Sequence, residues 1–95
     1  MSMKEYSFIN ALEHMGFRLS HYTTDPVTSM AFVRRDSRLH ILEFSSGKAV
    51  AIYNSQVYLR ADDLSTLLYV VATNFYEDHL QEMEEDMFFS LVEEY

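Results

Sequence analysis

The chain of 95 residues contains no cysteine, one proline and two glycines. Without cysteine it can form neither a disulfide nor a thiolate metal site, so packing alone must hold its fold. Because Gly16 and Gly47 are the only glycines, there is no glycine-rich phosphate-binding loop, and no nucleophile elbow is present. These absences argue against an enzyme, and we expect no catalytic residues, no cofactor and no metal ion.

Long apolar runs are also missing. No stretch of about eighteen apolar residues occurs, and no charged-then-apolar leader, which argues against a membrane span or a signal peptide. The expected compartment is therefore the cytoplasm. A hydrophobic content of 48% with 15% aromatic residues is too rich for a disordered tail. A chain of this length builds one core, so residues 1–95 are predicted to form a single domain.

Lysine and arginine are absent after Arg60, although the chain carries seven of them. Residues 1–60 hold these seven bases and five acids, whereas residues 61–95 hold ten acids, which gives the net charge of −8. A field of one sign repels nucleic acid and attracts basic surfaces. We therefore expect no direct nucleic-acid binding, even though Arg34, Arg35 and Arg38 cluster at a predicted hairpin tip.

The spacing of apolar residues predicts an α+β domain. Ser2 and Glu5 have the spacing of a capping box, so a helix should follow them, and Gly16 should end it. The period then changes to two, which predicts strands at residues 17–22, 29–35, 38–44 and 48–53. Residues 57–60 could add a fifth, edge strand. Because the connections are short, neighbouring strands must be antiparallel, and the sheet should be a four- to five-stranded meander.

Two apolar stripes in helical period follow the sheet. Asp62 or Asp63 should cap a helix whose stripe runs from Leu64 to Phe75, and a second stripe occupies residues 76–91. At about 100° per residue the two stripes point about 140° apart, so one straight helix could not bury both against one sheet. The sequence therefore predicts a break near residues 74–78 and two C-terminal helices, the second turning back or projecting.

An acidic face lies opposite the second stripe on the helical wheel. Like charges at spacings of three and four residues destabilise a helix by about 0.2 to 0.5 kcal/mol per pair, so this face has a cost. Phe89 lies at the centre of the acidic arc, where an exposed aromatic ring could anchor a partner. The predicted partner-binding residues are Asp78, Glu82, Glu85, Asp86, Phe89 and Glu93.

A row of carboxylates along a helix can imitate a nucleic-acid strand, which carries one charge per about 3.4 Å of axis. The leading prediction is a non-enzymatic inhibitor that blocks a basic, nucleic-acid-binding site on a partner protein. In size and charge the chain is similar to small phage-encoded inhibitors of host defence, such as anti-CRISPR and anti-restriction proteins. That similarity is one of composition, and no motif or residue role is carried over from it.

Other interpretations of the same pattern stay open at this point. An immunity protein that neutralises a toxic nuclease would use the same charge array against a different partner. A secretion-type chaperone would instead bind an extended segment through its sheet or a hydrophobic groove, and its acidity would be incidental. The acidic face could also serve only to keep the protein soluble, and the sequence leaves open whether the chain forms a homodimer.

Overall fold

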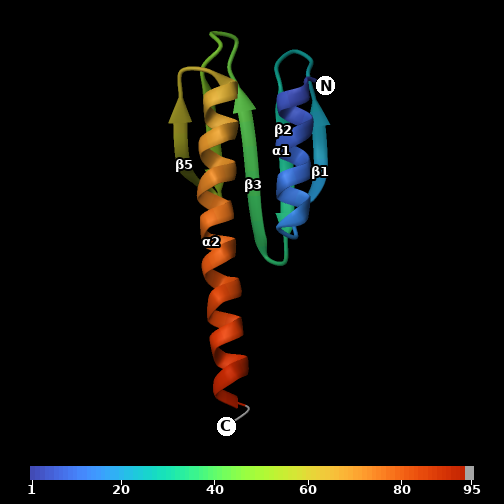
Figure 1. The fold of residues 1–95 in the computed structure, drawn as a ribbon. Helices are drawn as coiled ribbons and strands as arrows, with labels where there is room; N and C mark the ends of the chain where they lie inside the picture. The colour runs from blue at the N-terminus through green and yellow to red at the C-terminus, as the bar shows by residue number, and fades with distance from the viewer. Residues whose placement is uncertain (94–95) are drawn as a thin grey trace.

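The computed structural model describes the backbone of residues 1–93 and the side chains of residues 1–87. Helix α1 (Met3–His14) precedes a five-stranded sheet, and helix α2 (Leu64–Glu93) follows it (Figure 1). The strands are β1 (Arg18–Thr23), β2 (Ser29–Arg34), β3 (Ser37–Glu43), β4 (Ala49–Tyr53) and β5 (Gln56–Ala61). They pair antiparallel in the order β1-β2-β3-β4-β5, so the predicted α+β meander is confirmed with its fifth strand.

Helix α1 begins and ends where its sequence predicts. Ser2 Oγ accepts a hydrogen bond from the backbone N–H of Glu5 at 3.1 Å, which satisfies one unpaired donor of the first turn. At the other end Gly16 has a φ of 93°, and the N–H groups of Gly16 and Phe17 each bond back into the last turn at 3.0 Å. The Glu5 carboxylate accepts from the Tyr22 hydroxyl, which ties α1 to β1.

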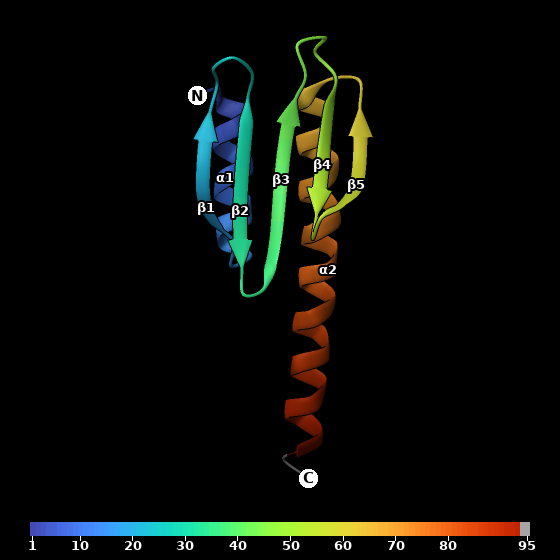
Figure 2. The ribbon, with the colours of Figure 1, turned by 180° about the vertical axis from the view of Figure 1, so that it is seen from behind.

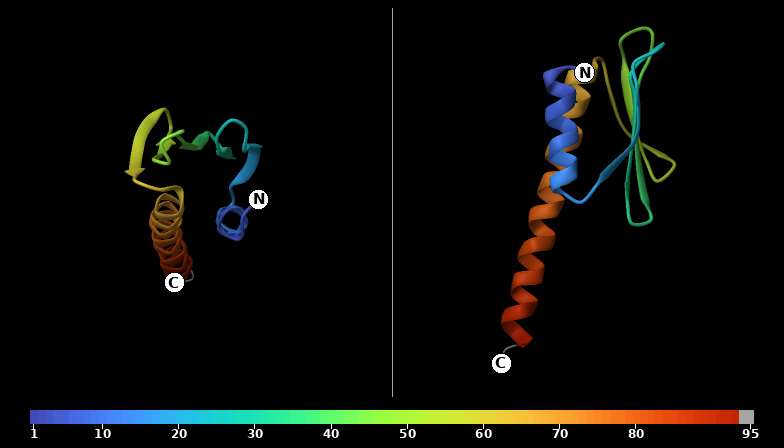
Figure 3. Two further views of the ribbon diagram at one scale, coloured as in Figure 1. Left: turned by 90° about the horizontal axis from the view of Figure 1, so that it is seen from above. Right: turned by 90° about the vertical axis from the view of Figure 1, so that its right-hand side faces the viewer.

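Both helices cover one face of the sheet and leave the other face open (Figures 2 and 3). α1 contacts β1, α2 contacts β4 and β5, and the two helices contact each other. The Phe8 ring packs edge-on against Phe32 of β2 at a centroid distance of 5.6 Å, which places the core between the helices and the sheet. The largest fully buried side chains are Leu12, Met30, Phe32, Leu39, Ile41, Leu67 and Val71.

Arg34 fastens the end of α1 to the sheet. Its Nη1 donates to the carbonyl oxygen of Met15 at 3.1 Å, and its guanidinium carbon lies 4.2 Å from the centroid of the Phe17 ring. A cation at a helix C-terminus also interacts favourably with the helix dipole. One arginine of the predicted hairpin cluster is therefore used inside the fold.

The prediction of two C-terminal helices is wrong, because α2 runs without interruption through residues 74–78. The prediction assumed that both apolar stripes must be buried. Instead α2 passes the end of the β4–β5 hairpin and projects away from the sheet (Figure 3), so its second stripe needs no break to be accommodated. We call residues 76–93 of α2 the arm. Over the described residues, neither helix is both long and apolar enough to cross a membrane.

Candidate protein-binding site

The character of α2 changes at Phe75. Residues 64–76 contain no charged side chain, whereas residues 77–87 contain six acids and no Lys or Arg. Phe75 is buried, and its ring packs against Phe17, Tyr53 and Tyr58 at centroid distances of 5.4, 5.1 and 5.5 Å. Beyond it, every side chain up to residue 87 is exposed except the half-buried His79. Within one chain, therefore, the arm is not held by tertiary packing over residues 80–87.

The acidic face lies on the arm as a single array. Because the helix is continuous, four of the predicted residues share an arc about 100° wide on the helical wheel. This arc continues the face that packs on the sheet further upstream. All four side chains are exposed: Asp78, Glu82, Glu85 and Asp86. The side chains of Phe89 and Glu93, which belong to the same prediction, lie outside the described part of the structure.

Three arginines of the sheet lie on the face away from α2, and Arg34, on the helix side, is bonded to Met15 at the end of α1. Strand register pairs Arg18 and Arg38 with Val33, and Arg60 with Val50, which places all three arginines on the open face. α2 packs on the opposite face (Figure 3). These three arginines and the acidic face of the arm are therefore not on the same side of the sheet, and the four carboxylates are exposed to solvent.

Two acids outside the arm accept hydrogen bonds from other residues of the chain, and they serve as a comparison for the acids of the arm. The Asp63 carboxylate caps α2 by accepting from the backbone N–H of Thr66 at 2.7 Å and from its hydroxyl at 3.1 Å. These hydrogen bonds lower the pKa of Asp63. The Glu5 carboxylate accepts from the Tyr22 phenol, and that bond raises the pKa of Tyr22 to about 12.

An exposed apolar stripe runs along the outer side of α2, and we call it the α2 stripe. Its members and their exposed fractions are Tyr69 (74%), Tyr76 (53%), Leu80 (40%), Met83 (54%) and Met87 (68%). Contiguous exposed apolar surface of this kind is typical of a protein interaction site. The sequence prediction included the stripe only from residue 76 onward and missed Tyr69. The spacing of seven residues from Tyr69 to Tyr76 to Met83 is the signal that could have revealed it.

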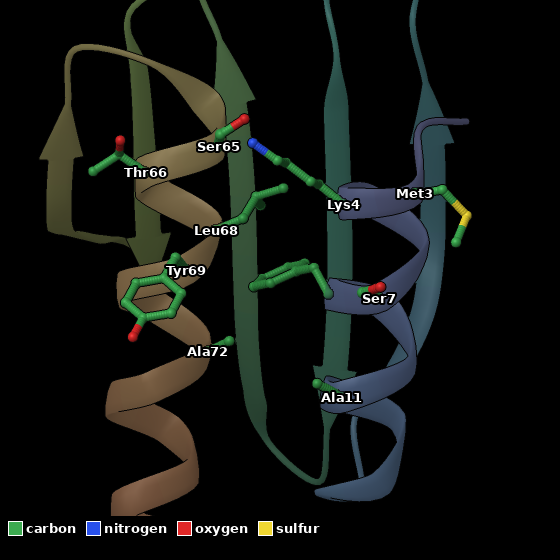
Figure 4. A pocket seen from close by; sticks show the side chains of 10 residues that line it. Met3, Lys4, Ser7, Ala11, Ser65, Thr66, Leu68, Tyr69 and Ala72 are labelled. Carbon is green, nitrogen blue, oxygen red and sulfur yellow. The ribbon is translucent and has the colours of Figure 1, made fainter.

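The stripe borders a groove between α1 and α2 with a volume of about 600 Å³. Figure 4 shows Lys4 and Ala11 of α1 facing Leu68 and Ala72 of α2 across this groove. Its lining is mainly apolar and contains one base, Lys4, and no acid. The sequence could not reveal the groove, because it depends on how far apart the two helices sit on the sheet.

No family model, no curated protein and no solved structure matches this chain. Its function must therefore be inferred from the chemistry of its surfaces. Among the described residues, no group of three or more His, Asp or Glu side chains is placed to hold a metal ion.

The open face of the sheet forms a second candidate surface. A depression of about 800 Å³ lies over β4 and β5, and its lining includes Leu42, Val50 and Ile52. At its edge Phe44 and Val57 are 52% and 54% exposed. Lys48, Arg60 and Asp62 also line it, so this surface is apolar with a charged border.

Proposed function

We propose that this chain is a non-enzymatic binding protein that uses the acidic face of its arm to occupy a basic, nucleic-acid-binding site on another protein. The observation that carries the proposal is the exposed acidic array on a helix that projects from the body. A like-charged surface of this kind destabilises the helix that bears it. The absence of Lys and Arg from this acidic surface is explained if a cationic partner neutralises it.

The charge density of the arm supports a phosphate-mimic role. Residues 77–86 carry six carboxylates along about 14 Å of helix axis. This density lies between that of one nucleic-acid strand, with one charge per about 3.4 Å, and that of a duplex, with one per about 1.7 Å. A groove that binds phosphates with Lys and Arg would therefore meet a comparable field. Such a partner could be a defence nuclease, a guide-RNA complex or a toxic nuclease.

The test is capture of the partner followed by competition. The chain is immobilised and exposed to a host lysate at low and at high salt, and the captured protein is then titrated with a labelled oligonucleotide in the presence of the chain. We expect capture only at low salt, because exposed charge pairs are screened, and we expect the chain to displace the oligonucleotide. Salt-independent capture, or a captured protein that binds both at once, would contradict the proposal.

Charge reversal identifies the surface involved. The triple substitution Glu82→Lys, Glu85→Lys and Asp86→Lys should weaken binding by at least about tenfold, since each change replaces attraction with repulsion. The matched control reverses three exposed acids away from the arm, Glu13, Asp25 and Asp36. Because both variants change the net charge equally, a similar loss in the control would show that overall charge, and not the arm, determines binding.

A second candidate function is favoured by the open sheet face. The exposed Phe44 and Val57 and the unpaired outer edge of β5 could hold an extended apolar segment, as a secretion-type chaperone does. Binding of this kind would resist salt and would be lost on the substitution Val57→Lys. It would be unaffected by charge reversal on the arm, so the same experiments separate the two functions.

A further inference from the structure

The α2 stripe has the spacing of a coiled-coil seam. Tyr69, Thr73, Tyr76, Leu80, Met83 and Met87 follow one another at intervals of four and three residues, which is the alternation of a and d positions in a heptad. All are exposed except Thr73, which is half-buried. We infer that two copies of this chain pair through this seam as an antiparallel two-helix coiled coil. This inference does not depend on the proposed function.

Charge determines the antiparallel orientation. In a parallel pair the acidic arms of the two copies would lie side by side. In an antiparallel pair each arm lies beside residues 64–76 of the other copy, a stretch with no charged side chain. The antiparallel arrangement therefore keeps most of the acidic side chains of the two copies apart.

The heptad positions define the register. In an antiparallel coiled coil an a residue of one helix packs in the same layer as a d residue of the other. Pairing about the level of residue 78 gives three layers in each half of the seam: Tyr76 against Leu80, Thr73 against Met83, and Tyr69 against Met87. The seam then covers about 27 Å of each helix.

The groove between α1 and α2 suits the far end of the partner's arm. Tyr69 lines this groove, so its layer with Met87 brings the acidic arm of the second copy alongside it. The lining of the groove contains Lys4 and no acid, so it adds no repulsion to the arm beside it. Its apolar residues, among them Leu68 and Ala72 (Figure 4), would be covered at the same time.

A second copy satisfies the geometry better than an unrelated helix. The arm that protrudes from one copy and the groove that receives an arm are both present in every chain, so a two-fold axis closes the assembly and leaves neither unpaired. The acidic face of each arm lies on the side of the helix opposite the seam and remains available. The dimer therefore presents two acidic faces at its two ends.

The mass in solution tests the inference directly. Light scattering at high protein concentration should give twice the chain mass of 11.2 kDa. The double substitution Leu80→Glu and Met83→Glu should return the chain to a monomer with unchanged folding of the body, because both side chains are exposed in one copy. The matched control, Glu82→Gln with Glu85→Gln, changes the acidic face of the same helix segment, opposite the seam, and should leave the dimer intact.

Disulfide trapping tests the register. Because the chain has no native cysteine, only the introduced cysteines can form a disulfide. An oxidised mixture of the Tyr76→Cys and Leu80→Cys variants should give a covalent heterodimer in high yield. The mixture of Asp78→Cys and Glu82→Cys, at neighbouring levels on the acidic face opposite the seam, should give little.

Three results would overturn the inference. These are a monomer at high concentration, a dimer that survives the two seam glutamates, and equal trapping in both cysteine mixtures. Salt separates this inference from the proposed function: high salt should leave the dimer intact or strengthen it, since screening removes repulsion between the two acidic chains. Binding of the arm to a basic partner should weaken under the same conditions.

Discussion

The two halves of α2 belong to one continuous helix but differ in charge and in burial. The first half has no charged residue and packs on the sheet up to Phe75, whereas residues 77–87 carry six acids and are exposed apart from the half-buried His79. The arm remains helical because its Glu, Met, Leu and Gln residues have high helix propensity and no Pro or Gly interrupts it. Burial fixes the first half in place; the second half gains nothing from it within one chain. This difference is the basis of our proposal that the arm contacts another molecule.

The largest expected effect tests the boundary between the two halves. Phe75→Ala should lower the free energy of unfolding by about 3 to 5 kcal/mol, because it leaves a cavity among three aromatic rings. The adjacent substitution Tyr76→Ala should cost less than about 0.5 kcal/mol, since its ring is exposed. Urea unfolding at dilute protein concentration measures both, and comparable losses would show that the boundary lies elsewhere.

Two arginines allow a comparison between a side chain that is used inside the fold and one that lies on the open face. Arg34→Met should cost about 1 to 3 kcal/mol, because it removes a charged hydrogen bond to Met15 and a cation–π contact with Phe17. The matched change Arg38→Met, on the open face, should alter stability by less than about 0.5 kcal/mol. Equal effects in urea unfolding would mean that Arg34 does not fasten α1 to the sheet.

The sequence prediction succeeded for patterns that have only one structural cause. Alternation in residues 29–35 and 38–44 arises because one side of each strand faces the core, and both strands are present. The capping serine and Gly16 act within a few residues, so the limits of α1 were also predictable. Local rules of this kind require no knowledge of the tertiary structure.

The errors came from features that depend on tertiary position. The break in α2 was inferred on the assumption that Leu80 and Met83 must be buried, yet the helix extends beyond the sheet and exposes both. The groove beside Tyr69 depends on the separation of two helices, which no spacing along the chain encodes. For the acidic array, exposure was predicted from the sequence, whereas the placing of Arg18, Arg38 and Arg60 on the open face of the sheet required the structure.

A smaller effect tests the electrostatic cost of the arm. Glu82 has Asp78, Glu85 and Asp86 at spacings of three or four residues, so Glu82→Lys should stabilise the arm by about 1 kcal/mol. Amide hydrogen exchange in residues 78–86 should slow by about fivefold. Glu77→Lys makes the same charge change, but no acid lies three or four residues from it. Equal slowing in both variants would assign the effect to net charge instead of to neighbouring carboxylates.

The smallest effect contrasts the arm with an acid that is engaged internally. The Tyr22 phenol donates to Glu5, and its pKa rises from 10.0 to about 12, so the folded chain holds this proton more tightly than the unfolded chain. Its contribution to stability is therefore full below pH 10 and is lost as the pH rises through the folded pKa. Urea unfolding across this range should show a steeper alkaline loss for the native chain than for Tyr22→Phe. Tyr69→Phe, at an exposed position, should follow the native curve. If Tyr22→Phe also follows it, Glu5 does not engage Tyr22, and this carboxylate would resemble those of the arm.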